Sequence, residues 1–233
     1  MTLVASDALL STSAAGAGNY QYTGIDRIAG LYVTAPGGTL LASAGRDINL
    51  LAAQLLNDAP TAAGQPAGST TLTAGRDIHL GAINQSEQSN ATLDPRNYIR
   101  FGQSSDVGTT IAGQGNVTLI AGNNLTAKAA DITSEQGAAG LYAGNDITLL
   151  AGAATRNMST ASFAEGSSFF SSGSTEIKNH QSVSTAQVTT IKGDSASVFA
   201  GHDALLEGTR IIARGNATVA AGNNLIAAAA QDS

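Results

Sequence analysis

The sequence of 233 residues predicts an all-β fold, a parallel β-helix in which short strands stack as successive coils. Three observations predict this fold class. One unit recurs along the chain: an apolar strand, Ala-Gly, any residue, Asp or Asn, and a second apolar strand. Apolar residues fall at every second position within the strands, as in Asp146-Ile147-Thr148-Leu149. The closest units are 21 or 22 residues apart, which accommodates three strands and three turns.

The glycines of the repeat define where each coil begins. A residue that is usually Gly stands seven positions before each motif Gly, and we take it as the start of a coil. The starts are 38, 68, 115, 137, 194 and 215, so their spacings are 30, 47, 22, 57 and 21 residues. We therefore expect three short strands and about 21–22 residues per coil, with a third strand such as 130–133 or 209–212 completing the circuit. Six such coils predict a rod about 30 Å long.

The Ala-Gly-x-Asp/Asn segments are predicted to be turns. Gly, Asn and Asp tolerate left-handed backbone, and Asp or Asn side chains bond nearby amides. The predicted turn residues are Gly45, Asp47, Gly75, Asp77, Gly122, Asn124, Gly144, Asp146, Gly201, Asp203, Gly222 and Asn224. A calcium site is the alternative for this column, but the Gly-rich nonapeptide of calcium-binding β-rolls is absent. His79, His180 and His202 do not point to a shared metal site either, so we predict neither a metal nor a cofactor.

Extra segments interrupt the coils at 16–24, 84–110 and 153–192, within one β-helix segment that spans 1–233. We expect the last of these to be a long antiparallel pair of strands with Ser167-Ser168-Phe169-Phe170 at its tip. Insertions in repeat proteins commonly build a recognition surface. The candidate partner-contact residues are Tyr98, Phe101, Phe163, Phe169 and Phe170. The alternative is that these aromatic rings only anchor the extra segments to the rod.

Composition excludes several classes of function. The net charge is −6 and no cluster of Lys and Arg occurs, so we predict no nucleic-acid partner. Because the chain has no cysteine, it forms no disulfide and no thiolate metal site. No apolar run approaches the ~18 residues that span a bilayer. The first residues lack a basic region and read as a strand, so we expect the chain to be cut from a longer protein.

The repeated Ala-Gly-x-Asp/Asn coils and the Gly-Ser-Ser-Phe-Phe-Ser-Ser sequence at 166–172 resemble the haemagglutinin repeats of large two-partner-secretion exoproteins. That family includes filamentous haemagglutinins and the exoproteins of contact-dependent growth inhibition. The resemblance covers roughly residues 2–230 and is closest to the downstream repeat region. It implies a right-handed parallel β-helix that is exported through an outer-membrane β-barrel partner of a Gram-negative bacterium. It carries over no catalytic residue.

We therefore expect a structural and interaction segment of a secreted, cell-surface filament, and not an enzyme. The resemblance implies roles in adhesion, or in contact-dependent toxin delivery that engages the surface or outer membrane of a target cell. The segment itself is expected to be monomeric, with end strands that are open to end-to-end association. The alternative is a carbohydrate-active β-helix enzyme, a lyase or hydrolase, for which Asp94, Arg96 and Arg100 form the densest charged group.

Overall fold

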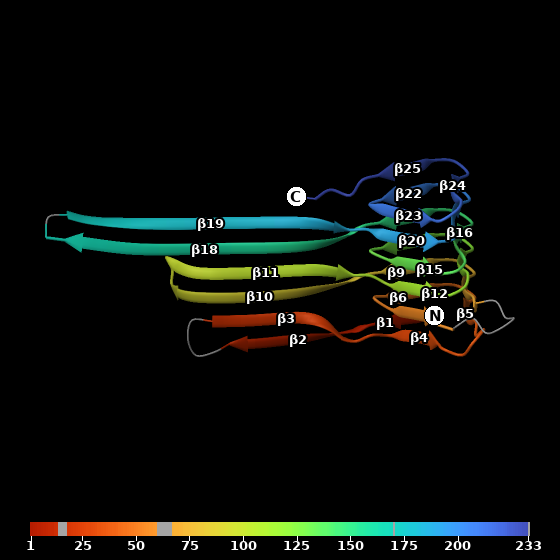
Figure 1. Cartoon of the computed structure of the whole chain (residues 1–233), viewed down its shortest axis with the longest axis horizontal. Coiled ribbons are helices and arrows are strands. Elements are labelled where there is room, and N and C mark those ends of the chain that lie inside the picture. Colours follow the sequence, from red (N-terminus) through yellow and green to blue (C-terminus); the bar gives the residue numbers. More distant parts are fainter. Residues whose placement is uncertain (14–17, 60–66, 170, 233) are drawn as a thin grey trace.

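The structure, a computed structural model, describes residues 1–13, 18–59, 67–169 and 171–232. The regular elements in these ranges are all strands, which confirms the predicted all-β class. Three parallel sheets form the walls of a stack of coils, and a fourth, antiparallel sheet projects from one side of the stack (Figure 1). No helix in the described part of the chain is long and apolar enough to cross a membrane.

Each coil contributes one strand to each wall, always in the same order. The first wall contains β1 (Thr2–Val4), β6 (Ile48–Leu51), β9 (Ile78–Gly81), β14 (Leu125–Lys128), β17 (Ile147–Leu150), β22 (Ala204–Glu207) and β25 (Leu225–Ala228). The second wall contains β4 (Gly30–Val33), β7 (Gln54–Asn57), β12 (Thr110–Gly113), β15 (Asp131–Ser134), β20 (Thr189–Gly193) and β23 (Thr209–Ala213). The third wall contains β5 (Leu40–Ala44), β8 (Thr70–Ala74), β13 (Val117–Ala121), β16 (Ala138–Ala143), β21 (Ser195–Ala200) and β24 (Ala217–Ala221).

The register of the walls places like residues over like, so the interior consists of aliphatic columns. In the second wall one column contains Leu31, Leu55, Ile111, Ile132, Ile191 and Ile211. The central members of this column and of the facing columns are fully buried. Each such side chain contributes roughly 1.5–3 kcal/mol through its burial. The three walls therefore enclose the aliphatic centre that the alternation in the sequence predicts.

The motif glycines lie at the corner between the third and first walls, but not for the expected conformational reason. None of them has a positive φ. Instead, each glycine lies directly over the glycine of the coil below. A Cβ added to Gly75, Gly122, Gly144, Gly201 or Gly222 would lie 2.1–2.3 Å from the carbonyl oxygen of that lower glycine. The left-handed interpretation was therefore wrong, because close stacking of backbones, and not turn conformation, requires glycine here.

The Asp and Asn residues of this corner connect successive coils by hydrogen bonds. The backbone N–H of Asn124 donates to Asp77 Oδ1 at 3.0 Å, and that of Asp203 donates to Asp146 Oδ1 at 3.0 Å. Asn224 donates in the same way to Asp203 at 2.9 Å, and this bond lowers the pKa of Asp203. Each of these side chains therefore satisfies an amide of the next coil, whereas the turn motif in the sequence predicted bonds within one turn.

The residue before each Asp or Asn, the variable position of the motif, supports the same column. Asn123, Asn145 and Asn223 each donate from Nδ2 to the column oxygen one coil below, at 2.8–2.9 Å. Where Asp47 lies under Asp77, this position is Arg76, whose Nε and Nη2 bind Asp47 at 2.8 and 2.6 Å and lower its pKa. Stacked carboxylates repel one another, so an arginine offsets their charge at this step.

Three hairpins leave the rod at one corner, between the first and second walls, and only in every second coil. They are β2 (Ser6–Ser13) with β3 (Gly18–Arg27), β10 (Ile83–Asp94) with β11 (Asn97–Val107), and β18 (Gly152–Ser168) with β19 (Ser171–Gln187). In the three coils without a hairpin, the corner residue turns the chain with a positive φ, at Ala52, Ala129 and Gly208. The three hairpins pair edge to edge as one antiparallel sheet, which we call the hairpin sheet (Figure 1).

The alternation follows from the spacing of strands. Neighbouring strands lie about 4.8 Å apart, so a two-stranded hairpin is about 9.6 Å wide, and two coils rise by the same amount. A hairpin in every second coil therefore fills the side of the rod without gaps. Hairpins in successive coils would overlap, and rarer hairpins would leave unpaired edges.

The structure also corrects the bounds of the extra segments. Residues 189–193 form β20 in the second wall, and Thr110 begins β12 in the same wall, so the predicted segments 153–192 and 84–110 extended into the coils. The first extra segment, predicted at 16–24, belongs to the larger hairpin of β2 and β3, and its residues 16 and 17 lie outside the described ranges. The predicted antiparallel pair is confirmed, because Gly152 pairs with Gln187 and Ser168 with Ser171.

We predict that Gly122→Ala destabilises the rod. Its new Cβ would lie 2.3 Å from the Gly75 carbonyl oxygen, and relief of that overlap requires the coils to separate. The expected loss in the free energy of unfolding is about 1–3 kcal/mol, measured by denaturant titration. Gly45→Ala is the matched control, because nothing lies within 4 Å of its added Cβ. Equal losses in the two variants would contradict the steric argument.

We predict that Asp203→Asn makes the rod less sensitive to acid. The pKa of Asp203 is lowered by the Asn224 amide, so its contribution is present above the unfolded-state pKa of about 3.9 and is lost as the pH falls below it. An asparagine keeps the acceptor oxygen, as Asn124 does, but does not titrate in this range. Denaturation midpoints from pH 7 to pH 2 should fall less steeply in Asp203→Asn than in the original chain. Parallel decreases would show that this carboxylate does not contribute to acid sensitivity.

We predict that deletion of residues 83–108 preserves the rod but disrupts the hairpin sheet. The deletion joins Ala82 to Thr109 and so recreates the corner of the coils that carry no hairpin. It leaves β3 and β18 about 14.4 Å apart, three strand spacings, without the two strands that lay between them. In hydrogen exchange, the amides of β18 that pair with β11 should lose protection while those of β13 keep it. Protection of β18 equal to that in the original chain would overturn the spacing argument.

Candidate functional site

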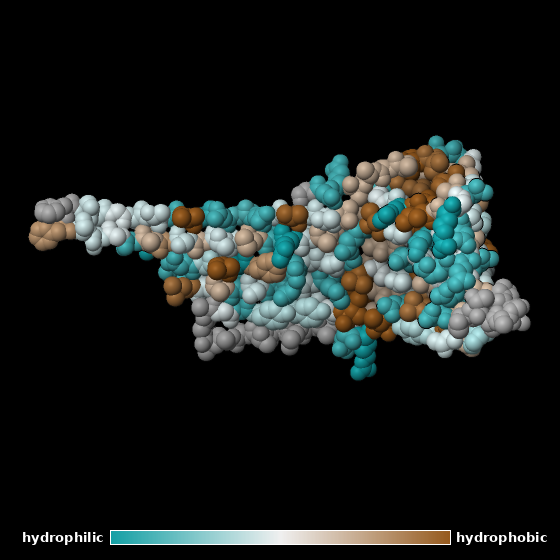
Figure 2. All heavy atoms as spheres, viewed as in Figure 1, coloured by the Kyte–Doolittle hydropathy of each residue, from teal (hydrophilic) through white to brown (hydrophobic). Residues whose placement is uncertain are grey.

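The hairpin sheet is the candidate functional site, because it projects from the rod and exposes side chains on both of its faces. Its strand order is β2-β3-β10-β11-β18-β19. Figure 1 shows that β18 and β19 reach beyond the other strands, and β11 pairs with β18 only from Ala154 to Ala161. Figure 2 shows a visible surface that is mostly hydrophilic or neutral over the projecting sheet, with hydrophobic residues concentrated toward the rod.

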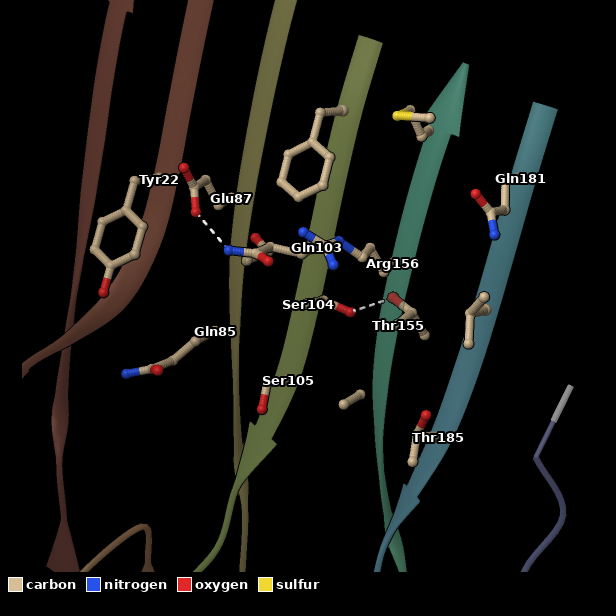
Figure 3. Close-up of a pocket in the computed structure, with 15 residues that line it drawn as sticks. Tyr22, Gln85, Glu87, Gln103, Ser104, Ser105, Thr155, Arg156, Gln181 and Thr185 are labelled. Carbon is tan, nitrogen blue, oxygen red and sulfur yellow. Dashed lines mark hydrogen bonds between the residues drawn. The ribbon is translucent and has the colours of Figure 1, made fainter. Parts of the chain in front are cut away.

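Strand register determines which side chains share one face of this sheet. Tyr22, Glu87, Gln103, Arg156 and Val183 lie directly opposite one another on β3, β10, β11, β18 and β19. Because side chains alternate along a strand, Phe101, Met158 and Gln181 belong to the same face. We call it the groove face, since these residues line a hollow of about 910 Å³ that crosses the five strands (Figure 3).

Polar contacts organise the groove face. Gln103 Nε2 donates to Glu87 Oε2 at 2.6 Å (Figure 3). Gln187 Nε2 donates to Ser105 Oγ at 2.8 Å. The guanidinium of Arg156 lies 5.3 Å from the centre of the Phe101 ring. Partial burial and the charge of Glu87 raise the pKa of Tyr20, a neighbour on the same face. The groove thus combines the Glu87 carboxylate, the Arg156 guanidinium and several glutamine amides.

The ring of Tyr22 lies over Gly24, two residues further along β3. A Cβ at Gly24 would lie 2.0 Å from Tyr22 Oη, so the tyrosine ring occupies the space that a side chain at position 24 would fill. Any larger residue at position 24 would displace the ring. Glycine at this position therefore leaves the space that the Tyr22 ring occupies at the border of the groove.

The opposite face carries a different set of contacts. Arg100 lies over the Tyr98 ring at 4.2 Å, and Arg96 lies over the Phe163 ring at 3.7 Å. The backbone N–H of Phe163 donates to Asn97 Oδ1 at 2.8 Å. Tyr98 and Phe163 thus pack under arginines on this face, and the contact between Arg96 and Phe163 connects the turn of the β10–β11 hairpin to β18.

The five aromatic residues predicted to contact a partner do not form one cluster. Phe101 lies on the groove face, whereas Tyr98 and Phe163 lie on the opposite face. Phe169 is at the end of the longest hairpin with 96% of its surface exposed. Phe170 lies outside the described residues. Their contact with a partner therefore stays a prediction, and the structure divides it among three separate locations.

The charged residues of the alternative enzyme hypothesis each have a structural partner. Asp94 accepts from Asn97 Nδ2 at 2.8 Å and from the Arg96 backbone N–H at 2.7 Å, and these bonds lower its pKa at the turn between β10 and β11. Arg96 and Arg100 lie over different rings. A carboxylate with a lowered pKa is a poor general acid, and the three side chains do not converge on one position.

One group in the described part of the chain has the geometry of metal ligands. His202 Nδ1 lies 3.4 Å from Asp146 Oδ1 and 3.1 Å from Asp203 Oδ2, at a corner where carboxylates stack. Its position in the repeat matches that of Arg76, which lies between Asp47 and Asp77. His79 contacts Thr126 on the first wall, and His180 lies on the hairpin sheet, so the three histidines are apart, as the sequence indicated.

The residues of the groove face were not identified from the sequence. Tyr22, Gln103, Arg156 and Gln181 come from four strands that are far apart along the chain. The available signal was the period of two within each extra segment, which gives the face of each residue once the strands are aligned. The alignment itself depends on where each hairpin leaves the rod.

Comparison with known proteins agrees with this architecture. The family model described as hemagglutinin repeat matches residues 102–233, more than half of the chain. No curated protein and no solved structure matches the chain. The matched range contains the hairpin of β18 and β19 and the coils around it. The resemblance of the repeated coils to haemagglutinin repeats is therefore confirmed, and the chain belongs to the hemagglutinin repeat family.

Proposed function

We propose that the chain is a segment of a filamentous haemagglutinin-like exoprotein at the bacterial cell surface, in which the rod supplies reach and the hairpin sheet supplies contact with another cell. One observation carries the proposal: all three hairpins leave from the same corner and pair as one sheet. An extended, side-chain-rich surface on one side of a rod is suited to contact with a large partner.

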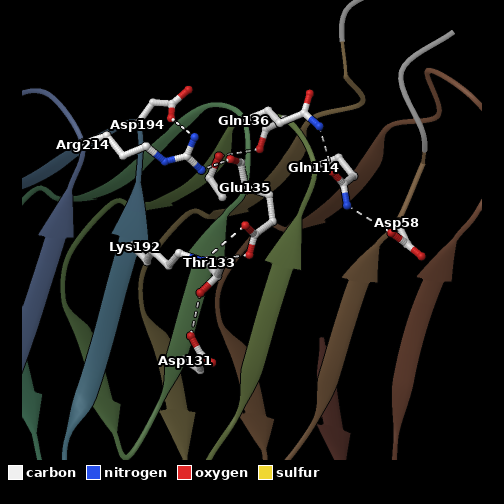
Figure 4. A network of polar contacts seen from close by, with 11 residues as sticks. Asp58, Gln114, Asp131, Thr133, Glu135, Gln136, Lys192, Asp194 and Arg214 are labelled. Atoms are coloured by element: carbon white, nitrogen blue, oxygen red, sulfur yellow. Dashed lines mark hydrogen bonds and ion pairs between the residues drawn. The ribbon is translucent and has the colours of Figure 1, made fainter.

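The rod has the cross-links expected of a stiff support. At the corner between the second and third walls, Lys192 Nζ binds Glu135 Oε1 at 3.0 Å, and Arg214 Nη1 binds Asp194 at 3.1 Å (Figure 4). Gln136 Nε2 donates to Gln114, whose own Nε2 donates to Asp58 at 3.1 Å. These contacts join residues from successive coils. With the Asp/Asn column at another corner, they support a rod that holds the hairpin sheet at a fixed distance from its point of attachment.

The proposed contact serves adhesion, or it brings a toxin-bearing exoprotein to a neighbouring bacterium. In either case we expect secretion through an outer-membrane β-barrel partner and engagement of the target cell's surface or outer membrane. The absence of cysteine and the repeated, locally paired coils support export of an unfolded chain that folds outside the cell. Each coil forms its hydrogen bonds on the one before it.

The proposal predicts that binding to cells protects the hairpin sheet and not the third wall. Because the chain has no cysteine, single cysteines report cleanly on local access. Gln181→Cys, Ser182→Cys and Ser172→Cys sample the two faces and the outer end of the sheet, whereas Ser43→Cys and Thr218→Cys sample the third wall. On Gram-negative cells or outer-membrane vesicles, maleimide labelling should slow at least severalfold at sheet positions and remain unchanged at wall positions.

Two results would overturn this proposal. One is protection restricted to the third wall, and the other is failure of the intact chain to bind any cell or vesicle of a broad panel. Release of reducing sugars or unsaturated uronates from polysaccharide, lost in Asp94→Asn, would support the carbohydrate-active enzyme instead.

A further inference from the structure

We propose that the groove face of the hairpin sheet binds a neutral oligosaccharide that lies across the strands. This inference rests on the proposed function, because it names the chemistry of the contact. The hollow has a volume of about 910 Å³ and touches five neighbouring strands. It therefore extends over roughly 19 Å, which suits a short linear chain better than a single small molecule.

The ligand of this groove has to be recognised by side chains. In β10, β11 and β18 both backbone edges are paired with neighbouring strands, so no main-chain donors or acceptors are left for an added peptide strand. Recognition of peptides by strand addition needs a free edge. The groove lies across the interior of the sheet, where only side chains face the ligand.

The polar side chains of the groove match hydroxyl groups. The side chains of Gln85, Gln181 and Thr185 line the hollow and have no hydrogen-bond partner among the described residues (Figure 3). An amide offers both donors and an acceptor, and a hydroxyl of a sugar does the same. Gln103 differs, because its amide is already bound to Glu87 and orients that carboxylate. Three unpaired side chains on two strands can therefore bind several hydroxyls at once.

The rings of Tyr22 and Phe101 supply the apolar part of the site. They border the hollow from β3 and β11 and are both partly exposed. The C–H face of a sugar ring packs on an aromatic ring, and Tyr adds a polar tip. The Arg156 guanidinium lies beside Phe101 and restricts that ring, which lowers the entropy lost on binding. Gly24 leaves the space that the Tyr22 ring occupies.

Charge selects a neutral ligand over an acidic one. Glu87 and Arg156 lie in the same cross-strand row, so the charged pair within the groove sums to zero. The chain as a whole carries a net charge of −6, which disfavours acidic polysaccharides and anionic lipids. An apolar lipid would leave the amides of the groove without partners.

The test is a glycan array probed with the 233-residue chain, followed by calorimetric titration with the strongest neutral ligand. Phe101→Ala and Gln181→Ala should each weaken binding about tenfold or more. Tyr98→Ala and His180→Ala are the matched controls, because they alter the opposite face of the same strands, and they should change affinity less than about twofold. Circular dichroism and the thermal midpoint of each variant establish that the sheet is folded.

Several outcomes would overturn the proposal. These are no binding of any neutral glycan at millimolar concentration, equal losses in groove and control variants, binding of acidic glycans only, and binding of phosphatidylglycerol vesicles that Phe101→Ala does not affect. A competition experiment distinguishes failure of this glycan proposal from failure of the proposed contact function. If cells still protect Gln181→Cys and Ser182→Cys but excess neutral glycan does not compete, the contact role stands and the glycan assignment falls.

Discussion

The close stacking of one coil on the next is the constraint on which the rest of this structure depends. Backbones that approach to about 4.8 Å require corners without side-chain bulk and with partners for every amide. The Gly column provides the first, since an added Cβ would overlap the carbonyl below it. The Asp/Asn column provides the second, since each side chain accepts from an amide of the following coil. The aliphatic interior alone would not fix this spacing, because hydrophobic burial is not directional.

The same spacing explains the arrangement of the hairpins. A hairpin and two coils have the same height, so a surface made of hairpins can grow in step with the rod that carries it. The backbone conformation at the corner differs between the coils with and without a hairpin. With a positive φ the chain turns directly into the second wall, as at Ala52 and Ala129, and without it the chain continues outward. The hairpin sheet is thus a fourth wall of the repeat, and its continuity is the feature on which the proposed contact function depends.

The two faces of the hairpin sheet differ in chemistry although their strands are shared. On the groove face the amides and rings border a hollow, and on the opposite face arginines cover Tyr98 and Phe163. Aromatic residues near one another in the sequence, such as Tyr98 and Phe101, therefore have different environments. Their separation by an odd number of positions places them on opposite sides of the sheet.

The sequence by itself determined the fold class and the alternation that builds the aliphatic columns, because these follow from a local period that repeats with the chain. It also indicated a long antiparallel pair near 153–192. Only the tertiary structure decided that the three extra segments form one sheet, that Tyr22, Gln103 and Arg156 meet on one face, and that the motif glycines serve stacking instead of turning. These features depend on contacts between coils that are 20 to 60 residues apart. A local pattern states which side of a strand a residue occupies, but the register between distant strands is set by the height of the coils between them.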